Sequence, residues 1–165
     1  MRVRRGRHED LLAIGRLAEA GYWGGYTGLL RPETIGRMLA AAYSPGAVSR
    51  RLLRGGVVVA EDDSGIAGFL DAVPADHGID VSVIAIDPGS RRRGIGRALI
   101  EKATDHGRRA PLCADVLLGN LDAEAFFERL GFVPGEVVPG AWFDEDVVER
   151  RWWWLEAQRI GHPGI

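Results

Sequence analysis

Residues 80–103 read DVSVIAIDPGSRRRGIGRALIEKA, and this stretch indicates the fold more strongly than any other part of the chain. It begins with an apolar segment of strand character, which leads through Asp87, a proline and a glycine to three adjacent arginines. Two close glycines, Gly94 and Gly96, then open an amphipathic helix. One face of that helix carries Ile95, Ala98, Leu99 and Ala103. The order is strand, glycine-rich turn and helix, with positive charge concentrated at the turn.

A turn of this kind is suited to binding an anion. The first backbone N–H groups of a helix have no partner within it, and the helix dipole adds partial positive charge there. Glycines let a phosphate approach the backbone, and arginines add charge and bidentate hydrogen bonds. We therefore expect the turn from Arg91 to Arg97 to hold a phosphate or pyrophosphate group. The alternative is a plain connection whose arginines are solvated.

Two common phosphate-binding motifs do not fit this turn. Gly89 and Gly94 have the P-loop spacing, but the lysine and hydroxyl residue that should follow are absent. In the dinucleotide motif Gly94 and Gly96 fit, but Leu99 stands at the third glycine position. The acidic residue about 20 positions further on would be Asp115, which comes too early in its strand to bind a ribose. Nucleotide hydrolysis and dinucleotide binding are both disfavoured.

Length and composition set wider limits on the protein. The 165 residues suit one domain, and the net charge of −2 argues against a general nucleic-acid binder. Cys113 is the single cysteine, which excludes an internal disulfide framework and favours a reducing compartment. No stretch reads as a signal peptide or a membrane span. We expect a cytoplasmic protein without a membrane partner.

The remaining pattern predicts a single mixed α/β sheet with the order β-α-α-β-β-β-α-β-α-β-β. A loop is expected over 22–31, a possible extra helical turn over 47–54, a hairpin turn over 62–65 and a loop over 139–146. The predicted helices cover 8–21, 32–43, 94–107 and 122–131, and the predicted strands cover 1–6, 56–62, 66–73, 79–87, 112–119, 132–138 and 147–156.

Two motifs in this pattern resemble those of the GNAT acetyltransferase superfamily. RRRGIG, residues 91–96, matches its [QR]-x-x-G-x-[GA] signature. NLDAEAFFERLGF, residues 120–132, is similar to its second motif, in which Asn120, Ala123, Phe126, Gly131 and Phe132 fill the positions. The order of the elements resembles the GNAT fold throughout, so the resemblance covers residues 1–165 as one domain. It implies an acetyl-CoA-dependent N-acetyltransferase that moves an acetyl group to a primary amine by direct attack.

The resemblance also implies a set of residues that hold acetyl-CoA or another acyl-CoA. Backbone N–H groups of the arginine-glycine turn would bind the pyrophosphate, the end of the preceding strand would pair with the pantetheine arm, and the second motif would flank that arm. A backbone N–H near Ile84 would polarise the thioester carbonyl. The implied residues are Ile84, Ala85, Ile86, Arg91, Arg92, Arg93, Gly94, Ile95, Gly96, Arg97, Asn120, Phe126 and Phe127.

The chemistry requires a base, because a protonated amine has no lone pair with which to attack. Asp80 is our candidate, since strand alternation would place Asp80, Ser82 and Ile84 on one face; His77 is a substitute. Alternatively, Asp80 is only an exposed carboxylate at the strand end.

Many family members have a tyrosine at Phe127, where it acts as the acid toward the leaving thiolate. Phenylalanine has no proton to give. The acid would then be Tyr22, Tyr26, Tyr43 or a water molecule, or no acid is needed.

The acceptor is expected between the first helices, the strand of Asp80 and the last hairpin. Tyr22, Trp23, Tyr26 and Trp142 are the candidate lining residues, although core packing would explain each of them equally well. Asp144, Glu145 and Asp146 could attract a cation, which suits a small amine with an apolar body or a peptide N-terminus. The four histidines show no metal-ligand spacing, so no metal is predicted. Residues 152–154, three tryptophans, suggest core packing or a homodimer contact.

Two other functions remain open at this point. A GNAT-fold module that senses acyl-CoA without efficient turnover is compatible with Phe127. An unrelated phosphate or nucleic-acid binder could use the arginines, and its binding would depend strongly on salt.

Overall fold

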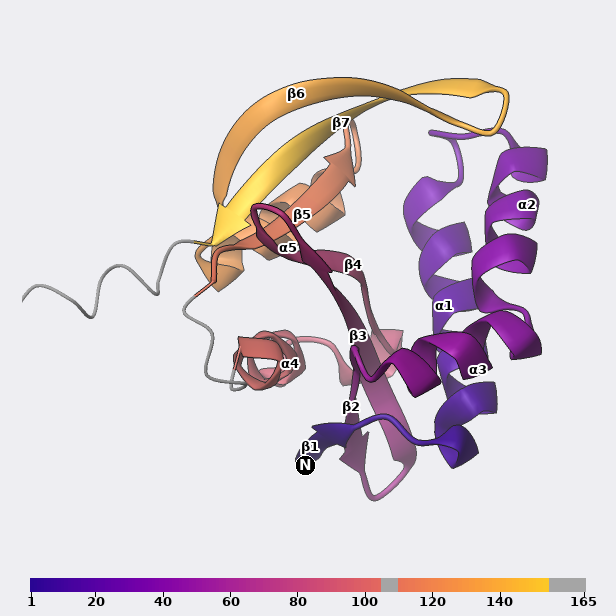
Figure 1. The fold of residues 1–165 in the computed structure, drawn as a ribbon, viewed down its shortest axis with the longest axis vertical. Coiled ribbons are helices and arrows are strands. Elements are labelled where there is room, and N and C mark those ends of the chain that lie inside the picture. Colours follow the sequence, from indigo (N-terminus) through magenta and orange to yellow (C-terminus); the bar gives the residue numbers. More distant parts are fainter. Residues whose placement is uncertain (105–109, 155–165) are drawn as a thin grey trace, which may run out of the picture.

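The computed structural model describes residues 1–104 and 110–154. Its strands form one sheet in the order β1-β2-β3-β4-β5-β7-β6, and β4 and β5 are its single parallel pair (Figure 1). The strands are β1 (Arg2–Arg5), β2 (Val57–Asp62), β3 (Gly65–Ala75), β4 (Gly78–Ile86), β5 (Leu112–Leu117), β6 (Val133–Trp142) and β7 (Glu145–Trp154). The expected mixed α/β sheet in one domain is thus the observed architecture.

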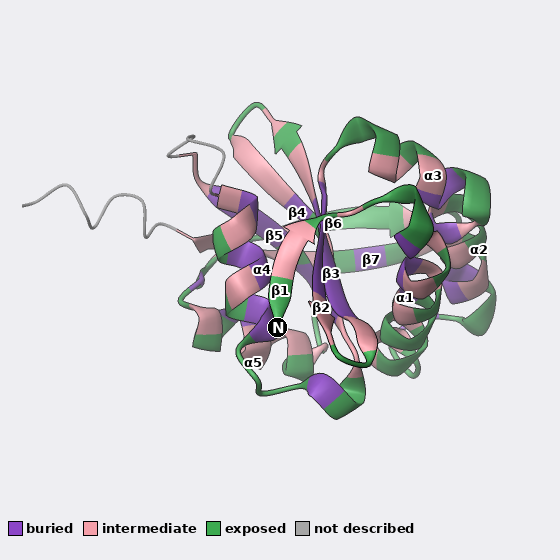
Figure 2. Ribbon diagram, turned by 90° about the horizontal axis from the view of Figure 1, so that it is seen from below, coloured by how far each residue is buried: buried purple, intermediate pink, exposed green. Residues whose placement is uncertain are grey.

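Helices cover both faces of this sheet. One face carries α4 (Ile95–Thr104) and α5 (Leu121–Leu130), whose Leu99 and Phe127 are buried against the sheet. The other face carries α1 (Leu11–Tyr26), α2 (Pro32–Tyr43) and α3 (Pro45–Arg54). Short 3-10 turns precede α1 at His8–Asp10 and α4 at Pro88–Ser90. Buried positions concentrate in the central strands between these layers (Figure 2). Within the described ranges, no helix is long and apolar enough to cross a membrane.

The first helix is longer than the sequence predicts. A stop was expected at Gly21 and a loop after it, but α1 continues through Gly24 and Gly25 to Tyr26. A Cβ on Gly21 would lie 3.5 Å from Ala85, and one on Gly25 would lie 3.4 Å from Asn120. Both distances are ordinary van der Waals contacts, so a Cβ would fit at either position. Tyr22 and Tyr26 pack into the apolar clusters, and this packing outweighs the low helix propensity of the glycines.

A full third helix stands where one or two extra turns were expected, so the predicted order lacked one helix. Pro45 cannot continue α2 but is well suited to the first turn of a new helix, and it opens α3 after Ser44. Gly55 ends α3 in the left-handed conformation, with φ of 84°.

The last two strands are also longer than predicted, because the expected loop over 139–146 is mostly strand. Pairing of β6 with β7 runs on from Pro139↔Val148 to Trp142↔Glu145. Pro139 is tolerated because β6 is the edge strand, where a missing backbone donor costs no ladder bond. The ends of the predicted segments 94–107 and 147–156 lie outside the described residues.

Candidate functional site

The sheet opens between its two parallel strands. β4 and β5 are paired at Ile79↔Leu112 and Asp80↔Cys113. Beyond these positions β4 pairs with β3 alone and β5 with β7 alone in the described chain. Figure 1 shows the two halves of the sheet diverging from this point. The facing edges of β4 and β5 therefore offer backbone hydrogen-bonding groups to a ligand, as a sheet edge offers them to an added strand.

The arginine-glycine turn lies directly beyond the end of β4. In the described part of the chain, the backbone N–H groups of residues 92–97 have no backbone acceptor, and that of Ala98 is the first to find one, at Gly94 O, 3.1 Å away. Arg92 and Gly94 have φ of 59° and 79°, the left-handed region that residues other than glycine rarely adopt. A run of free N–H groups in such a turn before a helix is the expected anion site.

The four arginines of this turn are exposed, as a phosphate-binding role requires. Of these four side chains, Arg93 forms an ion pair, in which its Nη1 donates to Asp62 Oδ2 at 3.1 Å. This ion pair ties the turn to the β2–β3 hairpin. Arg91, Arg92 and Arg97 keep their guanidinium groups in solvent beside the free N–H groups.

Gly96 has a packing role that the sequence did not indicate. A Cβ at this position would lie 2.8 Å from two ring atoms of Phe126 and 3.4 Å from Ile86. The glycine thus lets the first turn of α4 contact α5, whereas phosphate access alone was expected to explain it. The ring of Phe126 packs against the first turn of α4 at Gly96.

The second motif caps α5. Asn120 is the N-cap, and its Oδ1 accepts a hydrogen bond from the backbone N–H of Ala123 at 3.2 Å. Phe127 is buried, with its ring centroid 5.3 Å from that of Phe126 and 5.0 Å from that of Phe132.

Asp80 lies at the point where the strands part, in a small polar cluster. Its Oδ1 is 2.5 Å from Nε2 of His77, which follows β3. One donor atom each of His77, Asp80 and Cys113 lie within 4.8 Å of one another. Burial raises the pKa of Cys113 to about 12. The histidine spacing did not indicate this cluster, because it joins a turn and two strands.

A β-bulge in β4 changes the predicted orientation of Asp80. Asp71 of β3 pairs with Val83, but the next residue, Ala72, pairs with Val81. Ser82 is therefore an extra residue in β4.

The prediction that Asp80 and Ile84 share one face is consequently wrong. Ile79, Val81 and Ile84 all belong to the core beneath α4 and α5. Asp80 lies between Ile79 and Val81, so it faces the α1 side, while the bulge returns Ile84 to the opposite face. A bulge cannot be read from an alternating sequence.

Three of the four expected acceptor residues come together on the α1 side. The ring centroids of Tyr22 and Tyr26 are 5.2 Å apart, and those of Tyr26 and Trp142 are also 5.2 Å apart. Trp23 lies apart from this group, because it is 38% exposed and belongs to none of the apolar clusters. Tyr43, a candidate acid, is buried between α2, α3 and β3, with a hydroxyl that has no partner in the described residues.

The acidic hairpin tip is neutralised by α2. Asp144 accepts from Arg37 at 2.6 Å, and Glu145 lies 3.4 Å from Arg31. Figure 1 shows the β6–β7 hairpin reaching over to this end of α2. Asp144 and Glu145 therefore close the hairpin onto the helices, and they are unsuited to the expected role of attracting a cation.

Glu149 is an acidic residue that the sequence analysis missed. It lies on β7 opposite Leu117, half-buried on the same side as Tyr22 and Tyr26. Burial, helped by the charge of Asp115, raises the pKa of Glu149, and Trp142 partly offsets this through a side-chain hydrogen bond. Its place inside a run of strand residues gave no sequence signal.

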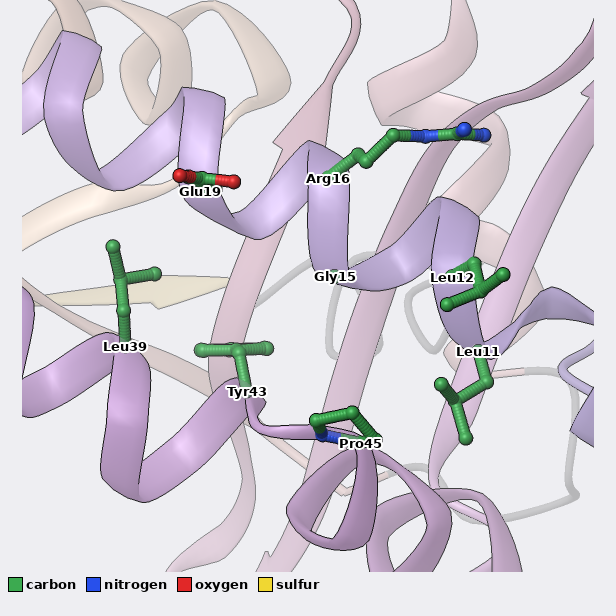
Figure 3. A pocket seen from close by; sticks show the side chains of 8 residues that line it. All are labelled: Leu11, Leu12, Gly15, Arg16, Glu19, Leu39, Tyr43 and Pro45. Carbon is green, nitrogen blue, oxygen red and sulfur yellow. The ribbon is translucent and has the colours of Figure 1, made fainter.

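A separate shallow groove runs along the first half of α1. It is lined by Leu11, Leu12, Gly15, Arg16, Glu19, Leu39, Tyr43 and Pro45 (Figure 3). Tyr22 and Tyr26 lie one to two turns further along the helix, so this groove is distinct from the aromatic group.

Comparison with known proteins agrees with this geometry. The family model described as an acetyltransferase (GNAT) domain matches residues 54–134. An uncharacterized N-acetyltransferase of Methanocaldococcus jannaschii is 41% identical over 64 residues, which are 37% of this chain and 28% of that protein. The matched part is thus little more than a quarter of this relative.

Solved structures extend the likeness to almost the whole chain. PaiA N-acetyltransferase of Thermoplasma acidophilum, in complex with coenzyme A, has a TM-score of 0.74 at 18% identity, covering 90% of this chain and 96% of PaiA. YncA of Salmonella typhimurium, with its cofactor acetyl-CoA, has a TM-score of 0.64 at 20% identity, covering 93% and 92%. The fold is that of the GNAT N-acetyltransferases, and residues 54–134 match the GNAT acetyltransferase domain.

Proposed function

We propose that the protein is an acetyl-CoA-dependent N-acyltransferase that acylates a primary amine by direct attack. The observation that carries the proposal is the run of free N–H groups over 92–97, directly beyond the open edge of β4. A phosphate-bearing ligand with an extended, amide-containing arm matches both features. Coenzyme A bound to PaiA and acetyl-CoA bound to YncA support this choice of ligand.

The residues present fit such a ligand. The N–H groups of the turn and the guanidinium groups of Arg91, Arg92 and Arg97 would hold the pyrophosphate, and the β4 edge from Ile84 to Ile86 would pair with the arm. Bound acetyl-CoA supplies an acetyl group activated as a thioester. The backbone N–H near Ile84 would polarise the carbonyl of that group.

Asp80 and His77 would take the proton from the acceptor amine. Both lie on the α1 side of the sheet, which is the side of the aromatic acceptor residues. Asp80 accepts a hydrogen bond from His77 or receives the proton itself, so the pair can act as one base. Tyr22 and Tyr26 are the remaining candidates for an acid toward the thiolate, because Tyr43 is enclosed in the core.

Burial raises the pKa of both tyrosines, so they stay protonated at neutral pH. A hydroxyl in this state can donate its proton but is a weak acid, and a thiolate is a tolerable leaving group without one.

The first test is a thermal melt with acetyl-CoA, with CoA and ATP as controls. Ligand at about 100 times its dissociation constant should stabilise the fold by about 2.7 kcal/mol. For a domain of this size that is a rise of roughly 5–10 °C in Tm. The proposal expects this rise with acetyl-CoA and CoA but a clearly smaller one with ATP, followed by amine-dependent thiol release. A folded protein that melts at one temperature under all conditions would refute it.

A second candidate function follows from Phe127. Its ring is buried and bears no hydroxyl, which favours a GNAT-fold sensor of acyl-CoA without efficient turnover. The sensor predicts the same rise in Tm but no thiol release with any amine.

A further inference from the structure

Three side chains from different elements meet beyond the open end of the sheet. Tyr26 comes from the last turn of α1, Trp142 from the end of β6 and Glu149 from the middle of β7. The rings of Tyr26 and Trp142 are edge to face, with an interplanar angle of 85°. Glu149 lies opposite Leu117, which packs in one apolar cluster with Tyr26 and Trp142. The ring centroid of Tyr22 lies 5.2 Å from that of Tyr26, so the neighbouring ring of Tyr22 helps to hold Tyr26 in place.

The carboxylate in this group has no cation of its own. Within residues 1–104 and 110–154, no arginine or lysine forms an ion pair with Glu149. Arg151, the nearby arginine of the same strand, is held by Asp115 through two bonds of 2.8 and 3.0 Å. Asp115 adds negative charge near Glu149, and Arg151 adds positive charge there without forming an ion pair with Glu149. A half-buried carboxylate among aromatic rings thus lacks the positive partner that such a group normally has.

An ammonium group would satisfy this environment. Its N–H groups can donate to the carboxylate, and the electron-rich faces and hydroxyls of aromatic residues stabilise a cation that has lost part of its water. A neutral or anionic group would leave the negative charge of Glu149 without a counter-ion. The chemistry of the site therefore selects a cationic nitrogen.

The sheet register separates this group from the base. Cys113 of β5 lies opposite both Asp80 and Trp153, whereas Leu117 lies opposite Glu149. Four strand positions along β5 correspond to roughly 13 Å. One nitrogen cannot reach both places, so a cation at Glu149 is different from the amine that loses its proton at Asp80.

We propose that Glu149, Tyr26 and Trp142 form an ammonium cage that holds a second cationic nitrogen of the acceptor while its other end is acylated. The acceptor is then an extended diamine with an apolar linker. This inference rests on the proposed function, because it assigns the acceptor class of the same site.

The test compares 1,8-diaminooctane with octylamine, two probes of equal chain length that differ in the second nitrogen. Thiol release from acetyl-CoA should give a KM about tenfold lower for the diamine, which corresponds to about 1.4 kcal/mol. In Glu149→Gln the two KM values should become nearly equal. Glutamine has nearly the size of glutamate, so the variant removes the charge and changes little else. Asp63→Asn, an exposed acid on the β2–β3 turn, is the control and should keep the preference.

Calorimetry separates failure of the cage from failure of the proposed function. It measures 1,8-diaminooctane binding to the CoA-loaded protein, and the binding should weaken about tenfold in Glu149→Gln without any turnover being needed. Binding that depends on Glu149 without acyl transfer would support the cage and refute the enzyme. Equal preference for the two probes in the wild type, or a preference that Glu149→Gln leaves unchanged, would overturn the cage.

Discussion

At the scale of single residues, the contact between His77 and Asp80 decides how the base works. If the two act as a pair, Asp80→Asn and His77→Gln should each lower kcat for amine acylation by about 100-fold at neutral pH. The pH–rate profile should change shape in both variants, because each removes one partner of the proposed base. Asp76→Asn, an exposed acid in the same turn, is the control.

The measurement is thiol release across pH, with a thermal melt to show that each variant binds acetyl-CoA. A wild-type profile in both variants would show that the cluster has only a structural role, whereas loss in one variant alone would name the single base.

How much of the site the sequence predicted also depends on single residues. The arginine-glycine turn was predictable because its signal is local: residue types at fixed spacing around one turn. Asp80 was placed in the correct strand but on the wrong relative face, because one extra residue, Ser82, changes the alternation. Glu149 was missed because its environment comes from α1 and β6, and neither is near it in the sequence.

At the scale of elements, a buried aspartate fixes α3 to the sheet. Asp71 of β3 is fully buried, and it accepts from Arg51 and, at 2.7 Å through each of its oxygens, from Arg54. Asp71→Ala should lower the free energy of unfolding by about 3 kcal/mol, because two guanidinium groups lose their buried partner. Urea denaturation measures this, and Asp63→Asn on the exposed β2–β3 turn should change almost nothing. An unchanged midpoint for Asp71→Ala would mean that apolar contacts alone hold α3.

The junction of β1 with α1 makes stability depend on acid. Burial opposes ionisation of Asp10, but hydrogen bonds from Arg4 and from the Arg7 N–H outweigh it and lower the pKa of Asp10. An acid with a lowered folded-state pKa stabilises the fold above its unfolded pKa of about 3.9, and this contribution is lost as pH falls through the folded value.

Asp10→Asn should therefore cost about 2 kcal/mol at neutral pH, and this cost should shrink as pH falls below the unfolded pKa. Chemical denaturation of both proteins at several pH values measures the difference. A difference that stays constant as pH falls would contradict the assignment.

Some helices and strands could be located from sequence patterns, whereas the ends of others could not. Strand periodicity located β1 to β5, and Pro32 and Gly131 marked the start of α2 and the end of α5 correctly. Glycines misled the prediction for α1, because packing of Tyr22 and Tyr26 in the apolar clusters overrides their low helix propensity. Prolines and glycines misled it again in the last hairpin, where an edge strand tolerates them.

At the scale of the whole molecule, the two halves of the sheet meet through few bonds. The β4–β5 ladder spans two residue pairs, and the hairpin tip adds the ion pairs of Arg31 and Arg37. A ligand arm between the open edges would add hydrogen bonds along β4 and join the two halves. Binding of CoA should therefore slow hydrogen exchange in the turn over 92–97 and along residues 84–86, where the β4 edge facing β5 is unpaired within the described residues.

Exchange followed by mass spectrometry, with and without CoA, would measure this, and peptides from α3 serve as an internal reference because they lie away from the opening. Protection confined to 92–97 would mean that the turn binds phosphate while the arm lies elsewhere. Protection over both segments would mean that the open sheet itself forms the binding site. Bound CoA would then join β4 to β5 beyond their short ladder, so that stability and cofactor binding depend on the same backbone groups.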